Sequence, residues 1–111
     1  MDGFDIDEID EVIHGRVRLG VMAYLSSAQR AEFGELKARL QVTDGNLSVH
    51  LRKLEDAGYV TVEKSFVGRK PMTKVALSDA GHAAFVRYLD AMTKLVDEAR
   101  GEASPLHDGQ D

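Results

Sequence analysis

Short polar and basic side chains gather between residues 43 and 57, in a stretch with helical periodicity. Its outward face is expected to carry an amide, a hydroxyl, a branched apolar group and a guanidinium, which belong to Asn46, Ser48, Val49 and Arg52. The base edges of the DNA major groove offer partners for each of these groups. A solvated amphipathic helix carries similar side chains, so the helix by itself leaves both interpretations open.

The start of this predicted helix offers groups for the DNA backbone. Thr43 is a favourable N-cap, with Asp44 in the first turn. Free N–H groups at a helix start can bind phosphate, and Gly45 permits close approach to the sugar–phosphate backbone. Lys53 and His50 are expected to hold or approach phosphates, although His50 lies beside the leucine stripe and could instead satisfy a local hydrogen bond.

A second basic cluster surrounds a predicted turn over residues 67–71. It consists of Lys64, Arg69 and Lys70. An arginine at a hairpin tip can enter the minor groove, while lysines contact phosphates. Charge on a hairpin edge also protects it against aggregation, which is the alternative interpretation.

The elements that must position both clusters follow from local patterns. Leu47, Leu51 and Leu54 recur every three or four residues and predict the buried stripe of the helix over residues 43–57. Gly58 is expected to end that helix. Similar patterns predict helices over residues 11–27 and 33–40, strands over 59–62 and 72–77, and a long helix that Ser78 caps.

The chain of 111 residues has a formal net charge of −5, distributed unevenly. Residues 1–13 hold six acidic side chains and no Lys or Arg, whereas residues 14–74 hold eleven basic and six acidic ones. A locally basic middle can still meet phosphate, because charges are screened over about 8 Å at physiological salt. The acidic residues 1–10 are predicted to fray and residues 101–111 to form a disordered tail. One folded domain is therefore expected over residues 11–100.

What the sequence lacks argues against several classes of protein. No apolar run approaches the roughly 20 residues that span a bilayer, and the N-terminus is acidic rather than basic, so we expect no membrane contact and a cytoplasmic location. Without cysteine there is no disulfide framework or thiolate metal site. The four histidines have no ligand-like spacing, and no nucleophile motif or phosphate loop occurs. We therefore expect no metal, no cofactor and no catalysis.

The order helix, helix, turn, helix, strand, wing, strand, helix resembles the winged-helix transcriptional regulators related to the MarR and ArsR types. The matching text is DGNLSVHLRKLEDAGYVTVEKSFVGRKPMTKVALSDAG, with RLGVMAYL and FGELKARL upstream. The resemblance covers residues 17–88. It implies a mainly helical α+β fold, a winged helix-turn-helix with a two-stranded β-wing and a long C-terminal dimerisation helix. It places the recognition helix at residues 43–57 and the wing at residues 64–72.

The resemblance also implies a function. The protein would be a sequence-specific DNA-binding transcriptional regulator, expected to be a repressor, that acts as a homodimer on a near-palindromic operator in double-stranded DNA. Whether a small-molecule effector binds between the long helix and the recognition domain is left open. Metal-sensing ArsR relatives use cysteine-rich motifs, which this chain lacks. The alternative is a winged helix used only for protein contacts, which would not need the basic residues of the helix and wing.

A separate physical argument favours a dimer. The last predicted helix has a wider apolar stripe than one small domain needs, although the stripe could instead close the core of a single chain. Two-fold symmetry would set two reading surfaces about 34 Å apart on one face of DNA. The residues expected at the interface are Val12, Ile13, Phe85, Tyr88, Leu89, Met92, Leu95 and Val96.

Overall fold

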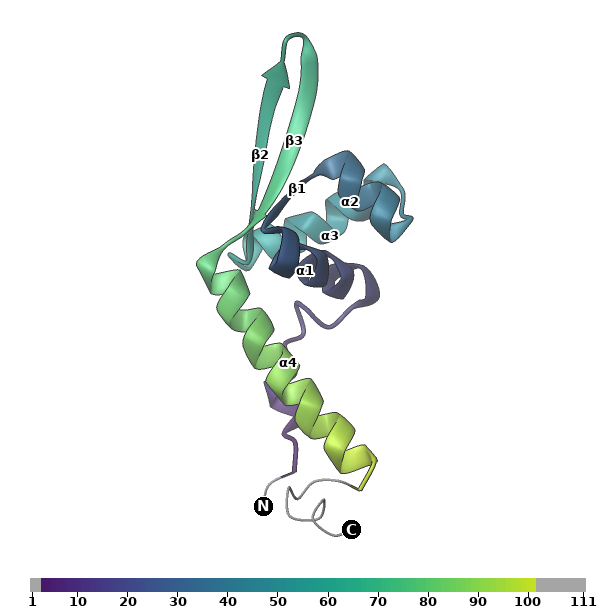
Figure 1. The fold of residues 1–111 in the computed structure, drawn as a ribbon, viewed down its shortest axis with the longest axis vertical. Helices are drawn as coiled ribbons and strands as arrows, with labels where there is room; N and C mark the ends of the chain where they lie inside the picture. The colour runs from purple at the N-terminus through teal and green to yellow at the C-terminus, as the bar shows by residue number, and fades with distance from the viewer. Residues whose placement is uncertain (1–2, 102–111) are drawn as a thin grey trace.

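The computed structural model describes residues 3–101, so the predicted acidic tail lies outside the described residues except for Gly101. Four α-helices and three strands form a winged helix, which confirms the predicted fold class (Figure 1). The third strand, β1, adds to the two-stranded wing that was predicted. The elements in order are the 3-10 helix η1 (Ile6–Glu8), α1 (Arg16–Ala28), β1 (Arg30–Glu32), α2 (Phe33–Leu40), α3 (Asp44–Asp56), β2 (Val60–Val67), β3 (Lys70–Leu77) and α4 (Asp79–Ala99).

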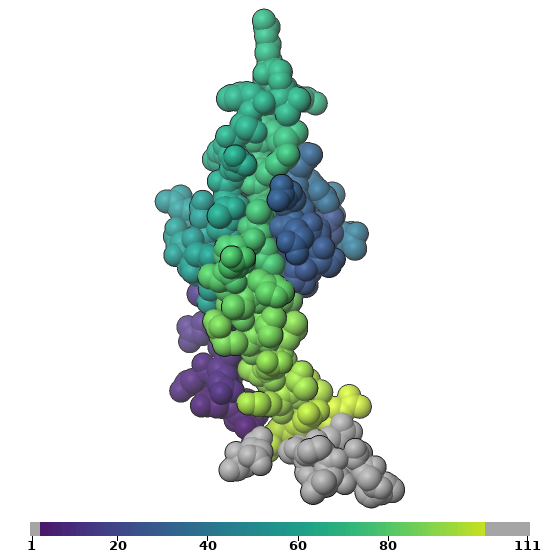
Figure 2. Space-filling model, turned by 60° about the vertical axis from the view of Figure 1, so that its left-hand side comes forward, coloured from purple at the N-terminus to yellow at the C-terminus, as the bar shows by residue number. Residues whose placement is uncertain are grey.

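The molecule is elongated, with principal extents of 63 × 24 × 22 Å. Helices α1, α2 and α3 cluster beside the base of the sheet. The β2–β3 hairpin rises from this cluster and α4 leaves it in the opposite direction (Figure 1). The space-filling view shows the hairpin narrowing to a tip that stands clear of the helices (Figure 2). The hairpin and α4 therefore expose much of their surface to other molecules.

The sheet is antiparallel with the order β1–β3–β2, and β2 pairs with β3 from Val60 opposite Leu77 to Val67 opposite Lys70. Both strands are longer than predicted, because their outer residues are exposed and lack the apolar alternation of a half-buried strand. Strand β1 pairs with β3 over three residues, of which only Ala31 is buried. A strand this short leaves too little pattern to predict.

The core lies where the helix cluster meets the base of the sheet and the first half of α4. The predicted stripe of α3 is buried, with Leu47 and Leu54 at 0% and Leu51 at 3% exposure. Full burial of one such side chain contributes about 1.5–3 kcal/mol, so this stripe anchors α3 firmly. The largest fully buried side chains are Tyr88, Ile13, Met22, Leu25, Leu36, Leu47, Leu54, Val21 and Val75.

The segment before α1 packs onto the core. Helix α1 begins at Arg16 rather than at the predicted residue 11. Asp10 interrupts the helical pattern, because its Oδ1 accepts from two backbone N–H groups at 2.8 and 3.3 Å. Ile9 and Ile13 are buried, and η1 forms within residues 6–10, where fraying was predicted. Local side-chain bonding and core contacts therefore give this acidic segment a defined course.

The junction between the wing and α4 is packed around Ser78. Its hydroxyl caps α4, as predicted, by accepting from the N–H of Gly81 at 2.9 Å, and it donates to the carbonyl oxygen of Gly58 at 2.6 Å. Gly58 follows α3 with a φ of 82°, a conformation that glycine adopts at little cost. A Cβ at Gly81 would lie 2.1 Å from the carbonyl oxygen of Tyr59. Helix α4 therefore starts in direct backbone contact with the residue that leads into β2.

Candidate nucleic-acid interface

The outward face of α3 carries the side chains predicted to contact bases. Thr43 caps the helix, since its Oγ1 accepts from the N–H of Asn46 at 3.1 Å. Gly45 is exposed, and a Cβ there would meet no atom within 4 Å. Val49 keeps 56% of its surface exposed although it is apolar. The exposed side chains of this face are Asn46, Ser48, Val49, Arg52 and Lys53.

His50 links α3 to α1. Its Nδ1 lies 2.8 Å from Nη1 of Arg18, and Nε of Arg18 donates to the carbonyl oxygen of Val12 at 2.5 Å. Partial burial lowers the pKa of His50 below its ordinary value, and the charges of Arg18 and Lys53 lower it further. The neutral imidazole is therefore favoured, with Nδ1 as the acceptor from Arg18. A phosphate would have to meet His50 through its other ring nitrogen.

A hollow of about 700 Å³ lies between α3 and the wing. It brings Ser48 and Arg52 of α3 together with Lys64 of β2. The acidic Asp44 and Glu55 line the same hollow, so its charge is mixed rather than uniformly positive. The tertiary structure thus joins part of the predicted helix cluster and part of the predicted wing cluster in one concave surface. Its other lining residues are Phe33, Leu51, Val62 and Thr73.

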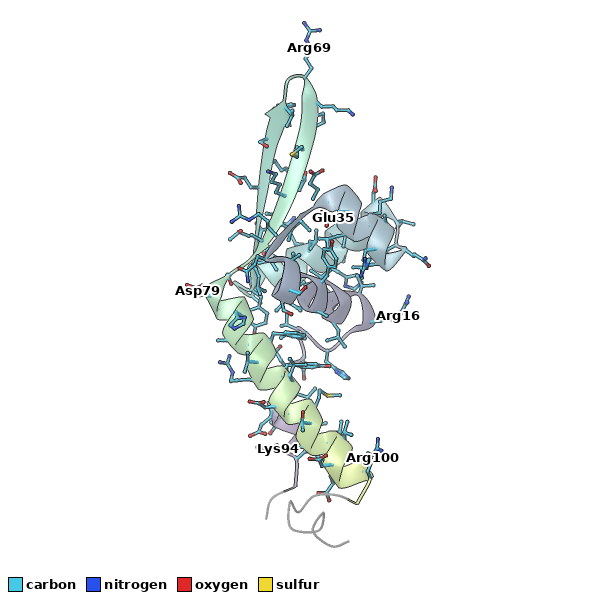
Figure 3. The ribbon with its side chains drawn as sticks, viewed as in Figure 1. Arg16, Glu35, Arg69, Asp79, Lys94 and Arg100 are labelled. Atoms are coloured by element: carbon cyan, nitrogen blue, oxygen red, sulfur yellow. The ribbon has the colours of Figure 1, made fainter. Side chains whose placement is uncertain are left out.

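The wing divides its three predicted basic side chains among three directions. Successive side chains of a strand point to opposite faces, and the register sets Lys64 opposite Thr73 but Lys70 opposite Val67. Lys64 therefore shares the face of the hollow, and Lys70 lies on the other face. Arg69 occupies the turn and points away from the body at the tip (Figure 3).

Two apolar residues at the wing tip were missed as candidate site residues. Phe66 is 72% exposed and Val67 is 58% exposed. The sequence held a signal for them, because they stand directly before the predicted Gly-Arg-Lys turn. Apolar side chains at a hairpin tip beyond the core have no core contacts to make.

The residues predicted at a dimer interface fall into three groups by burial. The core of the same chain buries Ile13, Phe85 and Tyr88, so this part of the stripe closes the domain. Half-buried positions are Val12, Met92 and Leu95. Leu89 and Val96 keep 47% and 44% of their surfaces exposed and are accessible to a second chain.

A second hollow, of about 840 Å³, lies between the η1 segment and α4. It lies beside α4, where an effector was left open, but its other wall is the η1 segment rather than the predicted recognition helix. Acidic side chains outnumber Lys and Arg in its lining, which includes Arg87 and Lys94. Lys94 pairs with Glu8 across this hollow at 3.7 Å, which connects α4 with η1.

Among residues 3–101, no group of three or more His, Cys, Asp or Glu side chains is arranged to hold a metal ion. His107, which entered the prediction about histidine spacing, lies outside that range. In the same part of the chain, no helix is both long and apolar enough to cross a membrane.

Comparison with known proteins bears on this geometry. A family model described as winged helix DNA-binding domain matches residues 17–96. An uncharacterized protein of Methanocaldococcus jannaschii is 34% identical over 85 residues, which are 77% of this chain and 92% of that protein. The solved structure of a transcriptional regulator homologue from Pyrococcus horikoshii OT3 is 32% identical, with a TM-score of 0.79, over 85% of this chain and 95% of that one.

Regulators of both predicted types share the fold at lower identity. A MarR family transcriptional regulator from Streptomyces coelicolor, solved in complex with DNA, is 21% identical with a TM-score of 0.67, over 92% of this chain and 71% of that one. An ArsR family transcriptional regulator is 20% identical with a TM-score of 0.54, over 83% of this chain and 90% of that one. The predicted resemblance is therefore confirmed, and it is to regulators rather than to enzymes.

Proposed function

The chain belongs to the family of winged helix DNA-binding domains, and on that premise we propose that it is a transcriptional repressor that binds a near-palindromic operator as a homodimer. The observation that carries the proposal is the concave surface between α3 and the wing, to which Ser48, Arg52 and Lys64 contribute from two elements. A helix in the major groove, flanked by a ribbon that contacts the backbone or the next groove, requires a surface of this kind.

Each predicted DNA-contacting residue has a proposed role that follows from its chemistry. Lys53 holds a phosphate, and His50 approaches one through the ring nitrogen that Arg18 leaves open. The N–H groups near Thr43 and Gly45 face another phosphate at the start of α3. The wing acts through Lys64, Arg69 and Lys70. The side chains that contact base edges are Asn46, Ser48, Val49 and Arg52, with Arg52 suited to guanine.

The charge of the chain determines how much of the DNA affinity comes from non-specific phosphate contacts and how much from specific fit. Non-specific affinity depends on the number of phosphates that Lys and Arg neutralise. Residues 43–74 hold six basic and four acidic side chains, and the whole chain has a net charge of −5. We therefore expect weak non-specific binding and a large contribution from the fit between α3, the wing and the grooves.

A second copy of the chain is the proposed partner of the exposed stripe on α4. Val86, Leu89 and Val96 are 44%, 47% and 44% exposed. At 100° per residue they lie within about 80° of one another around the helix axis. Two-fold pairing through this stripe would present two α3 helices to successive turns of DNA, about 34 Å apart.

The proposal also covers the cellular location of the protein and a small-molecule effector. A regulator that binds the chromosome acts in the cytoplasm of a cell without a nucleus, so the proposal includes that location. An unidentified small-molecule effector is retained as a prediction, and the hollow between η1 and α4 is the place to look for it.

Selection of bound sequences from a random pool of duplex DNA tests base recognition. We expect enrichment of a near-palindrome whose half-sites lie about one helical turn apart. Enrichment of a single half-site would contradict the dimer, while no enrichment would contradict base recognition and favour a winged helix that contacts proteins. The enriched site placed over a promoter should then lower reporter expression, and raised expression would overturn the repressor assignment.

Charged substitutions on α4 test the dimer. Leu89→Lys and Val96→Lys should halve the mass measured by light scattering, because each buries an unpaired charge in the proposed interface. Ala80→Lys adds the same charge at an exposed position of α4 that is about 120° or more from Val86, Leu89 and Val96 around the helix, and it should leave the mass unchanged. Equal masses for all four proteins would count against pairing through this stripe.

A further inference from the structure

The tip of the wing is apolar as well as basic. Phe66 has the largest exposed fraction among the exposed large hydrophobic side chains of the described residues, at 72%, and its neighbour Val67 is 58% exposed. All residues from 63 to 71 are exposed, so these two side chains fill no part of the core. Apolar side chains held this far from a core are typical of contact with another molecule.

The register of the hairpin gives the direction in which Phe66 lies. Phe66 is opposite Pro71, Lys64 is opposite Thr73, and Val62 is opposite Val75. Side chains two residues apart share a face, so these three pairs lie on the same side of the ribbon. Val75 is buried in the core, and the hollow beside α3 is lined by Val62, Lys64 and Thr73. Phe66 and Pro71 therefore lie nearer the tip on the same face of the ribbon that adjoins α3.

The turn fixes the end of the ribbon. Gly68 has a φ of 65°, which fits the first central position of a type II′ hairpin turn, and Arg69 follows it. At about 3.3 Å per residue, the strands carry the tip roughly 17 Å beyond the pair of Val62 and Val75. The major groove is about 12 Å wide, so a wing of this reach is long enough to pass its edge and meet the adjacent minor groove.

The charge around the tip identifies the kind of partner. Residues 64–72 contain Lys64, Arg69 and Lys70 and no acidic side chain. An apolar protein surface would leave these cations unpaired, whereas nucleic acid offers phosphates to the cations and base faces to the aromatic ring. Minor-groove proteins combine Arg or Lys with apolar wedges that enter a base step and kink the duplex.

We propose that Phe66, supported by Pro71 across the ribbon, is an apolar wedge that enters the minor groove beside Arg69 and unstacks a base step of the operator. This inference rests on the proposed function and deepens it, because it gives the wing a specificity for deformable steps in addition to its charge. Pyrimidine–purine steps such as TA and CA open most easily and are the expected target.

A fluorescent base analogue tests the wedge directly. The enriched operator is synthesised with 2-aminopurine at successive positions flanking each half-site, because its fluorescence rises when a base unstacks. Saturating wild-type protein should raise the fluorescence at one step per half-site. Phe66→Ala should abolish that rise at saturation and weaken affinity by between about fivefold and 150-fold, the usual range for losing an aromatic stack on a base. Phe66→Leu keeps an apolar wedge and should retain much of the rise.

Two controls separate the wedge from other roles of the wing. Val67→Ala removes apolar surface from the opposite face of the ribbon and should leave the rise intact. The salt dependence of affinity should be the same for Phe66→Ala and the wild type, because no phosphate contact is lost. A merely structural Phe66–Pro71 pair would change the thermal unfolding of the protein but not the fluorescence of saturated operator.

The outcomes distinguish this inference from the function on which it depends. Selective binding by the wild type with no rise at any position would overturn the wedge and leave the proposed function standing. Failure of the wild type to select any DNA would overturn both. A change in the mass of Phe66→Ala without DNA would assign the tip to a contact with a second copy, which also overturns the wedge.

Discussion

Nδ1 of His50 on α3 lies 2.8 Å from Nη1 of Arg18 on α1, and the same guanidinium donates through Nε to the carbonyl oxygen of Val12. One arginine therefore connects α3, α1 and the segment that precedes α1. His50 faces two cations, Arg18 and Lys53, and the pKa of its imidazole is lowered first by burial and then by these charges. The orientation of α3 is thus coupled to an imidazole whose protonation would place a third positive charge beside Arg18 and Lys53.

We expect the free energy of unfolding to decrease as the pH is lowered below about 6.5, the ordinary pKa of histidine. The pKa of His50 is lower in the folded state than in the unfolded state, so its contribution is present above 6.5 and is lost as the pH decreases towards the folded value. His50→Asn retains an acceptor near the position of Nδ1 but does not titrate, so it should remove this component in urea unfolding between pH 5 and 8. His82→Asn makes the same substitution at an exposed position on α4 and serves as the control. An identical pH dependence in His50→Asn would contradict the role of the pair.

The hydroxyl of Tyr59 donates to Oδ2 of Asp10 at 2.5 Å and ties the N-terminal segment to the start of β2. This hydrogen bond, with burial as the second cause, raises the pKa of Tyr59 to about 12. Tyr59→Phe should lower the free energy of unfolding by about 1 kcal/mol. A fully buried hydrogen bond to a charged group contributes more, but Tyr59 is only half-buried. Absorbance titration should show that one tyrosine ionises near pH 12 in the wild type and that this step is missing in Tyr59→Phe. The same step in both proteins would refute the assignment.

Gly81 and Gly45 form a matched pair, since both lie near the start of a helix. A Cβ at Gly81 would meet the carbonyl oxygen of Tyr59 at 2.1 Å, whereas a Cβ at Gly45 would meet nothing within 4 Å. Gly81→Ala should therefore cost more than about 3 kcal/mol or prevent folding, while Gly45→Ala should raise helix stability by up to about 1 kcal/mol. Operator affinity should nevertheless fall for Gly45→Ala if α3 lies against the sugar–phosphate backbone. Thermal unfolding and DNA titration of the same samples separate the two effects.

Arg52 is exposed on α3 and lines the hollow that adjoins the wing. If it contacts a base edge, Arg52→Ala should weaken operator binding by about 1–3 kcal/mol and relax selection at one operator position. Arg87→Ala removes an exposed arginine from α4 and serves as the control. A uniform loss of affinity on all sequences would show that Arg52 contacts phosphate rather than a base.

Arg69 points away from the body at the wing tip (Figure 3). Arg69→Ala should lower the slope of log affinity against log salt by about one unit if one phosphate contact is lost. Titrations at several salt concentrations measure this slope directly. An unchanged slope together with an unchanged affinity would count against a DNA contact by the wing.

Local patterns in the sequence determined much of the fold. The Leu47, Leu51 and Leu54 stripe, the Thr43 cap and the Ser78 cap each depend on residues within one or two helical turns, and the structure has all three. The basic wing and its turn were likewise predicted from the Gly-Arg-Lys sequence. The outer residues of β2 and β3 were not predicted to be strand, because they are exposed and show no alternation between a buried and an exposed face.

Contacts between distant segments decided the rest. Burial of Ile13 and Tyr88 in the core of one chain, which the apolar stripe alone left open, results from packing of the N-terminal segment against α4. The bond between His50 and Arg18 likewise joins parts of the chain that no local periodicity relates.

The sequence by itself determined what chemical groups each residue could offer to DNA, because residue type sets hydrogen-bonding capacity and charge. Only the tertiary structure decided which of them act together. The β2–β3 register places Lys64 and Phe66 on the face beside α3 and Lys70 on the other face. A shift of one residue in that register would exchange the two faces, and register depends on pairing and packing across the sheet rather than on the composition of either strand.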